Sequence, residues 1–240
     1  MQNNISKSSK NSQSNEYKCD HCSKTFKTES GWLKHSCKFK KRWNDRNEQF
    51  FIKGFEIFQK FYFFHTRSKK QKSRDDFIES KYYDYFIKLS LFLTNGLVCY
   101  TDKYYYYLFK NNIKMALWAE YDTYQKFLLD IYKTEEPHIA IERTLGYIGK
   151  WSSDLDIPWV DFFREISPGM ATDWIRYGKI SPWILYCNKG DFGLPLIERI
   201  TDEQLNIIAK IIDPVLWQRR LALGEKKILD YIDMLKDQGM

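Results

Sequence analysis

"YKCDHCSKTFKTESGWLKHSC", residues 17–37, concentrates side chains that bind metals. Two residues separate Cys19 from Cys22, twelve separate Cys22 from His35, and one separates His35 from Cys37. Thiolate sulfur and imidazole nitrogen are ligands that zinc prefers in proteins. Three aromatic residues accompany the ligands at a spacing that suits a small apolar core: Tyr17 before Cys19, and Phe26 and Trp32 between Cys22 and His35. A chance cluster of cysteine and histidine would not explain those aromatic positions, so the stretch predicts a folded zinc site.

Through His35, this pattern resembles the Cys2His2-type zinc finger family in its first three ligands and its three core positions. The resemblance implies a ββα unit of about 25 residues, which is too small to fold without its metal. Zinc binding would supply folding free energy of order 10–16 kcal/mol. The sequence departs from the family at the fourth ligand, because Cys37 stands where a more distant histidine is usual.

The identity of the fourth ligand depends on where the finger helix ends. Residues two apart in an α-helix point about 200° apart, so His35 and Cys37 cannot both face one ion from a continuous helix. We therefore expect the helix to end or unwind around Ser36, so that Cys37 returns from a turn. His21 is the alternative ligand, although a side chain at that position would normally point outward.

Positive charge is concentrated at the start of the chain. The net charge is +7, but residues 1–74 carry 18 Lys and Arg against 6 Asp and Glu, whereas residues 75–240 carry 20 against 25. Such asymmetry predicts a polyanionic partner for the N-terminal third.

The finger and the basic stretch after it are the candidate nucleic-acid contacts. The base-reading positions that the family resemblance implies fall on Thr28, Gly31 and Lys34, which are weak readers, and one finger covers only about 3 base pairs. We therefore expect contact with the nucleic-acid backbone, DNA rather than RNA, without base specificity. Trp43 and Phe39 could stack on unpaired bases. The predicted contacts are Thr28, Lys34, Lys38, Lys40, Lys41, Arg42, Trp43 and Arg46.

The remaining chain predicts a mainly α protein: a small N-terminal ββα finger followed by an all-α helical domain. The expected divisions are a disordered polar tail (1–15), the finger (16–38), a basic extension with a helix and a linker (39–74), and the helical domain (75–240). In the extension, Phe51, Phe55, Phe58 and Tyr62 fall at helical spacing, so that helix must pack on something.

The compartment is predicted to be intracellular. No apolar run approaches the roughly 20 residues of a membrane span, and the N-terminus has no apolar signal segment. Five cysteines are too few and too unevenly placed for a disulfide framework, and Cys99 and Cys187 are expected to be inert core thiols.

Two other functions remain open from the sequence. One is a structural or adaptor protein, for example of a virus particle, whose finger docks on another protein. The other is a metal-dependent nuclease that uses the acidic group Asp154, Asp156, Asp161 and Glu165. Acids at these positions are more often helix caps, so no catalytic residue is predicted and the protein is not expected to be an enzyme.

A second, looser resemblance covers most of the chain. The "CDHC…KHSC…KKRW" pattern followed by a long helical region is similar to uncharacterised proteins encoded by large tailed bacteriophages. It implies no activity, but it does imply expression inside a bacterial host.

Overall fold

The computed structural model describes residues 17–66, 70–95, 97–186 and 193–218, together with residues 220, 222, 226 and 230. The predicted tail, 1–15, and Cys187 lie outside these residues. Within them, a two-stranded sheet near the N-terminus is followed by helices alone. The predicted fold class, a ββα finger ahead of a helical domain, is confirmed.

The finger consists of two short strands and one short helix. β1 (Tyr17–Lys18) pairs antiparallel with β2 (Thr25–Phe26), and α1 spans Glu29–Leu33. The Thr28 hydroxyl caps α1 by accepting a hydrogen bond from the Gly31 amide at 3.2 Å. Because α1 ends at Leu33, His35 and Cys37 both lie outside it, as the ligand geometry requires.

The finger leads into a first group of helices: α2 (Lys38–Asn44), the 3-10 turn η1 (Asp45–Asn47), α3 (Gln49–Thr66), α4 (Arg74–Glu79) and α5 (Tyr83–Thr94). α3 packs along α5 and buries Phe51 and Phe58. Phe77 of α4 lies among their rings, 5.2 Å from Phe51 and 5.0 Å from Phe58. The expectation that this helix packs on something is confirmed, and its partners lie across the predicted boundary at 74/75. We therefore group α2 and α3 with the helical domain.

A second group of helices continues the same core: α6 (Thr101–Lys110), η2 (Met115–Leu117), α7 (Tyr121–Thr134) and α8 (Pro137–Leu155). Tyr104 of α6 is fully buried and donates its hydroxyl hydrogen to the Trp118 carbonyl at 2.8 Å. Pro137 occupies the first turn of α8, where its missing N–H costs no hydrogen bond.

Short helices complete the C-terminal part: η3 (Trp159–Asp161), α9 (Phe162–Glu165), α10 (Pro168–Arg176), α11 (Pro182–Leu185), α12 (Leu194–Ile197) and α13 (Asp202–Ile208). Ser181 caps α11, and Thr201 and Gln204 form a capping box at the start of α13. Trp217 is buried and donates its indole hydrogen to the Ile211 carbonyl at 2.7 Å. Trp183 is also buried, but its indole nitrogen has no hydrogen-bond partner among the described residues.

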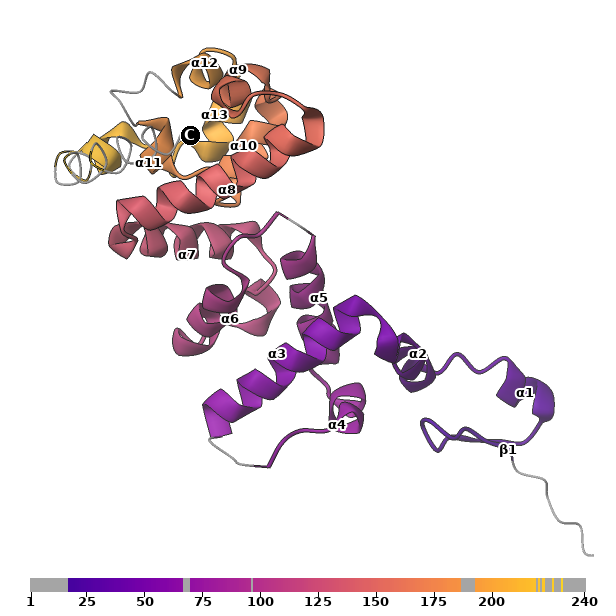
Figure 1. Ribbon diagram of the computed structural model, residues 1–240. Helices are drawn as coiled ribbons and strands as arrows, with labels where there is room; N and C mark the ends of the chain where they lie inside the picture. Colours follow the sequence, from indigo (N-terminus) through magenta and orange to yellow (C-terminus); the bar gives the residue numbers. More distant parts are fainter. Residues whose placement is uncertain are drawn as a thin grey trace, which may run out of the picture.

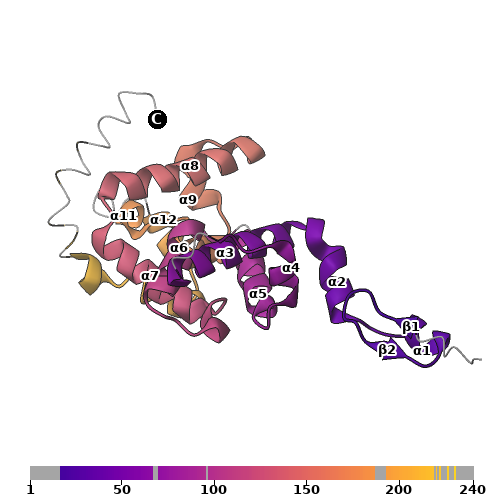
Figure 2. The same cartoon turned by 90° about the horizontal axis from the view of Figure 1, so that it is seen from below.

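The finger projects from one end of the helical body and joins it through α2 (Figures 1 and 2). The helices α8–α13 form the opposite end. Among the described residues, no helix has the length and apolar character that a membrane span requires.

Candidate metal centre and basic surface

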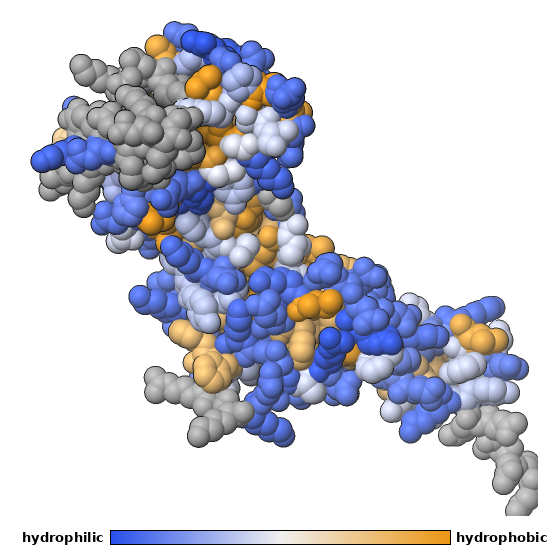
Figure 3. Space-filling view, viewed as in Figure 1, coloured by the Kyte–Doolittle hydropathy of each residue, from blue (hydrophilic) through white to orange (hydrophobic). Residues whose placement is uncertain are grey.

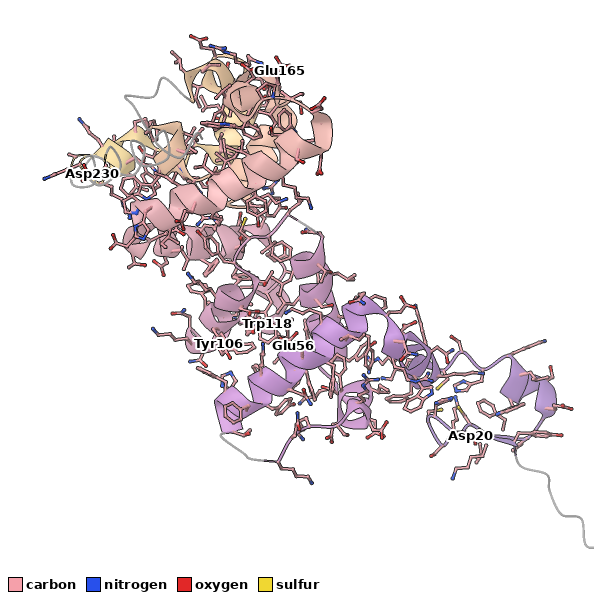
Figure 4. The ribbon with its side chains drawn as sticks, in the orientation of Figure 1. Asp20, Glu56, Tyr106, Trp118, Glu165 and Asp230 are labelled. Carbon is pink, nitrogen blue, oxygen red and sulfur yellow. The ribbon has the colours of Figure 1, made fainter. Side chains whose placement is uncertain are left out.

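Four potential metal ligands converge at the base of the finger. The sulfur atoms of Cys19, Cys22 and Cys37 and a ring nitrogen of His35 all lie within 4.8 Å of one another. The Cys22 sulfur is 3.2 Å from the His35 Nε2. Figure 4 shows the yellow sulfur atoms gathered between the finger and α2, close to the labelled Asp20. The structure therefore brings together the ligand set that the sequence predicts.

The turn between β1 and β2 positions the first two cysteines. The Cys19 amide donates to the Lys24 carbonyl at 2.9 Å, and the Ser23 amide donates to the Cys19 carbonyl at 2.8 Å. Ser23 adopts a left-handed conformation with φ of 57°, which closes this tight turn. The backbone N–H of His21 points to the Cys19 sulfur and holds the pKa of that thiol below its usual range.

The crowding of the sulfur atoms indicates that a cation belongs among them. A hydrogen bond from the Lys24 backbone favours the Cys22 thiolate, but burial and the thiols of Cys19 and Cys37 outweigh it and raise the Cys22 pKa. Without a cation, adjacent thiolates repel one another. A metal ion removes that repulsion and takes thiolates as its ligands.

The donor set fits zinc in a structural role. In a tetrahedral site with zinc–sulfur bonds of about 2.3 Å, ligand atoms lie about 3.8 Å apart, which the observed cluster can adopt with small shifts. If zinc is bound, three sulfur atoms and one imidazole nitrogen would supply all four ligands of a structural site. The Phe26 ring packs 4.8 Å from the His35 ring and supports the ligand from the finger's small core.

Cys37, not His21, completes the group. The His35 amide still donates to the Trp32 carbonyl at 3.1 Å, but the chain then extends, and Cys37 has φ of −98° and ψ of 113°. This extended residue turns its side chain back toward the other ligands. The His21 ring lies outside the group, with its centre 6.3 Å from that of Trp43.

Cys37 also begins the next helix. Its sulfur accepts a hydrogen bond from the Lys40 amide at 3.5 Å and so acts as the N-cap of α2. Cys37 therefore links the candidate metal centre to α2, the helix that carries Lys38, Lys40 and Lys41.

Arg42 has a structural role in this helix. The sequence predicts a phosphate contact at Arg42, but its side chain is buried and donates to the Ile78 carbonyl at 2.8 Å. The guanidinium also pairs with the Asp84 carboxylate at 3.2 Å and covers the Tyr83 ring at 4.0 Å. Burial raises the pKa of Tyr83 to about 12, so this hydroxyl stays neutral. Arg42 is therefore removed from the candidate nucleic-acid contacts.

Four other predicted contacts are exposed: Lys34, Lys38, Lys40 and Lys41. None of them forms an ion pair with another described residue, which leaves their ammonium groups available to a polyanion.

Trp43 and Arg46 form a small exposed platform beside these lysines. The Trp43 side chain is 38% exposed, and the Arg46 guanidinium lies 4.8 Å above its ring. By contrast, Phe39 packs against the core and cannot stack on a base. The Thr28 hydroxyl accepts the capping hydrogen bond of α1, which fixes the side chain at the start of that helix.

The acidic group considered for a nuclease is not assembled as a metal site. Asp161 lies in η3 and pairs with Arg164 at 3.4 Å, while Glu165 is exposed at the end of α9 (Figure 4). Among the described residues, only the cysteine–histidine group brings three or more potential ligands together.

The anchoring contacts of Arg42 have no signature in the sequence. Its partners lie at least 36 residues along the chain, and two of them are backbone carbonyls, which every residue carries. Only the packing of α2 on α4 brings these groups together.

Comparison with known proteins adds no support for the candidate metal centre, which is therefore supported by its geometry alone. The chain matches no protein-family model, no curated protein and no solved structure. The likeness to bacteriophage proteins therefore remains a prediction from the sequence, whereas the finger is supported by the convergence of its four ligands.

Proposed function

We propose that this protein binds zinc through its finger and contacts nucleic-acid backbone through the exposed lysines beside the metal centre, largely without reading bases. The observation that carries the proposal is the position of Lys38, Lys40 and Lys41. They stand in the helix that begins at the metal ligand Cys37, and they are exposed and unpaired among the described residues.

The rigid support of these lysines distinguishes them from charges on a loose tail. Zinc would hold the N-terminal end of α2 through Cys37, and Arg42 fastens the same helix to Ile78 and Asp84. Both attachments lie within one short helix, so the lysines keep a constant arrangement. With Lys34, four ammonium groups are available. For duplex DNA, this number corresponds to a slope of roughly −3 to −4 for log affinity against log salt concentration.

Base reading has little support at this surface. Thr28 is engaged in a helix cap, Gly31 has no side chain, and Arg42 is buried. Base edges are read by hydrogen-bonding side chains that reach into a groove, and Lys34 alone remains to do so. Contact with phosphates, which is independent of sequence, is the function that remains.

Apolar exposure on the finger supports an adaptor as the second candidate. Leu33 is 68% exposed and Trp32 is 37% exposed at the end of α1. Adjacent exposed apolar side chains are typical of protein-docking surfaces. If this candidate is correct, the finger will bind a protein and show no affinity for random DNA.

The deciding experiment measures binding of the full-length, zinc-loaded protein to a fluorescent random-sequence duplex over a range of salt concentrations. We expect the affinity of wild type to fall steeply as the salt concentration rises. In a plot of log affinity against log salt concentration, the slope of the double variant Lys38→Gln/Lys41→Gln should be smaller in magnitude by about 2. The matched control, Lys110→Gln/Lys126→Gln, changes the charge equally at exposed positions of α6 and α7 and should leave the slope unchanged. Absence of binding at low salt would contradict the proposal and favour the adaptor.

A further inference from the structure

A groove lies at the far end of α3 from the finger. It has a volume of about 870 Å³, and its walls come from the last turns of α3, from residues 70–72 and from Tyr106 of α6. α3 has 18 residues, so its two ends are about 27 Å apart. Figure 4 labels Glu56 and Tyr106, which mark this part of the molecule, well away from the metal centre.

Aromatic rings at this groove face solvent. Phe63 is 67% exposed, Phe64 is 41% exposed and Tyr106 is 47% exposed. The space-filling view shows apolar surface at this end of α3, bordered by hydrophilic residues (Figure 3). Clustered exposure of large apolar side chains is unusual unless the surface binds something.

The exposed rings are supported from behind. The Tyr106 ring lies 4.9 Å from that of Tyr105, and the Phe64 ring lies 6.0 Å from that of Phe109. Tyr105 and Phe109 are both buried in the core. Tyr106 and Phe64 are therefore held in place by packing, so their free faces can stack without a large loss of side-chain entropy.

Lysine side chains line the same groove. Lys60, Lys70 and Lys72 contribute positive charge, and Glu56 is the one acidic residue among the lining residues. Burial alone would raise the pKa of Glu56, but hydrogen bonds from Lys60 and Lys53 hold it below its usual value. Glu56 is thus paired within the protein, Lys72 also lies 4.0 Å from the Asp76 carboxylate, and the described lining carries three lysines against one carboxylate.

The lysine segment is fixed against α3. The Gln59 side-chain amide donates to the Lys72 carbonyl at 2.9 Å, and the Lys72 ammonium lies 5.1 Å from the centre of the Tyr62 ring. Cationic groups and aromatic faces are therefore held side by side in one groove.

We infer that this groove binds an unpaired strand of nucleic acid, with bases stacked on Phe63, Phe64 and Tyr106 and phosphates close to Lys60, Lys70 and Lys72. Successive aromatic faces beside positive charge are the features by which proteins hold single strands without base specificity. A duplex does not suit the groove, because its bases are stacked inside and cannot reach the rings. The inference goes beyond the proposed role of the finger and does not depend on it.

The test compares three ligands on the full-length protein by fluorescence anisotropy: oligothymidylate, an abasic strand of equal length, and a duplex. Stacking of bases on aromatic rings contributes much of the affinity of such grooves for single strands. The double variant Phe63→Ala/Tyr106→Ala should therefore bind oligothymidylate at least about 10-fold more weakly, with little change for the abasic strand or the duplex.

A matched variant controls for the loss of an exposed ring. Tyr85→Ala removes a side chain that is 39% exposed but lies outside the groove, so it should leave oligothymidylate binding unchanged. Circular dichroism spectra of all variants should coincide with that of wild type, because the altered side chains are exposed.

Three results would overturn the inference: equal weakening by Tyr85→Ala, equal weakening for the abasic strand, or displacement of oligothymidylate by oligoglutamate at matched charge concentration. The last would show that the groove recognises acidic peptides. The finger is tested separately, because Lys38→Gln/Lys41→Gln should weaken duplex binding and spare the stacking contribution at the groove.

Discussion

The finger and the helical domain are held together by different forces. In residues 17–37, the only buried side chains among the described residues are those of Cys19 and Cys37, and α1 buries none. The helical domain instead buries a continuous cluster that includes Phe77, Trp118 and Trp217. A segment as short as the finger cannot bury enough apolar surface to fold by itself, and its four clustered ligand side chains could hold a metal ion in place of a core. The comparison teaches that hydrophobic burial accounts for the helical domain, whereas the finger depends on the metal that we propose it binds.

The two forms of stabilisation meet in α2. Cys37 ties the start of this helix to the metal centre, and Arg42 ties its middle to α4 and α5. Variants on either side of α2 should therefore affect one region and spare the other.

The largest effect is expected from removal of a metal ligand. Cys19→Ser should abolish zinc binding and unfold the finger, because the ion supplies of order 10–16 kcal/mol to such units. Elemental analysis should fall from one zinc per chain to none, while the helical circular dichroism signal is largely retained. Cys99→Ser is the matched control, since Cys99 lies outside the ligand group. Full zinc content in Cys19→Ser would contradict the metal-held finger.

The next effect concerns the aromatic core. Phe77 is fully buried, with the Tyr83 ring 4.8 Å away and the Phe58 ring 5.0 Å away. Phe77→Ala should lower the free energy of unfolding by about 3–5 kcal/mol, measured in urea, and leave the zinc content unchanged. Phe63→Ala truncates an exposed ring of the same kind and should change stability by less than about 0.5 kcal/mol. A loss of zinc in Phe77→Ala would show that the two regions are not independent.

A smaller effect on stability should follow from removing the Arg42 contacts that attach α2 to α4 and α5. Arg42→Ala removes hydrogen bonds to the Ile78 carbonyl and to Asp84, which should cost about 1–3 kcal/mol of unfolding free energy. Zinc content should persist, but duplex binding should weaken, because the lysines of α2 lose their fixed arrangement.

Lys41→Ala is the comparison for Arg42→Ala. This neighbouring side chain is exposed, so its loss should weaken duplex binding without measurable cost in stability. If Arg42→Ala behaved in the same way, Arg42 would be a phosphate contact after all.

The smallest effect concerns pH. The pKa of Glu56 is held below its usual value, so its ion pairs stabilise the folded state above the unfolded pKa of about 4.3, and this contribution is lost as pH falls through the folded pKa. Because Glu56 and its partners are partly exposed, Glu56→Gln should cost less than about 1 kcal/mol at pH 7. The difference in unfolding free energy between Glu56→Gln and wild type should decrease at acidic pH, where Glu56 becomes protonated. Glu79→Gln, at an exposed position, should show no such difference at either pH.

The sequence by itself determined the fold class and predicted which potential metal ligands come together in the finger. Cys19, Cys22 and His35 are separated by short segments whose backbone geometry is limited, so their spacing is sufficient to predict that they converge. The end of the helix before Cys37 follows from the same local geometry, whereas the sequence left Cys37 and His21 open as the fourth ligand and the structure places Cys37 in the group. Helical periodicity likewise identified Phe51 and Phe58 as core residues.

Only the tertiary structure decided which side chains remain at the surface. Arg42 belongs to the same basic run as Lys40 and Lys41, yet it is buried because α4 and α5 offer acceptors at its position alone. Phe63 belongs to the same aromatic helix as Phe58, yet it is 67% exposed because none of the described helices packs over its face. The physical reason is that a local pattern defines the faces of a helix, whereas burial depends on contacts between segments far apart in the chain.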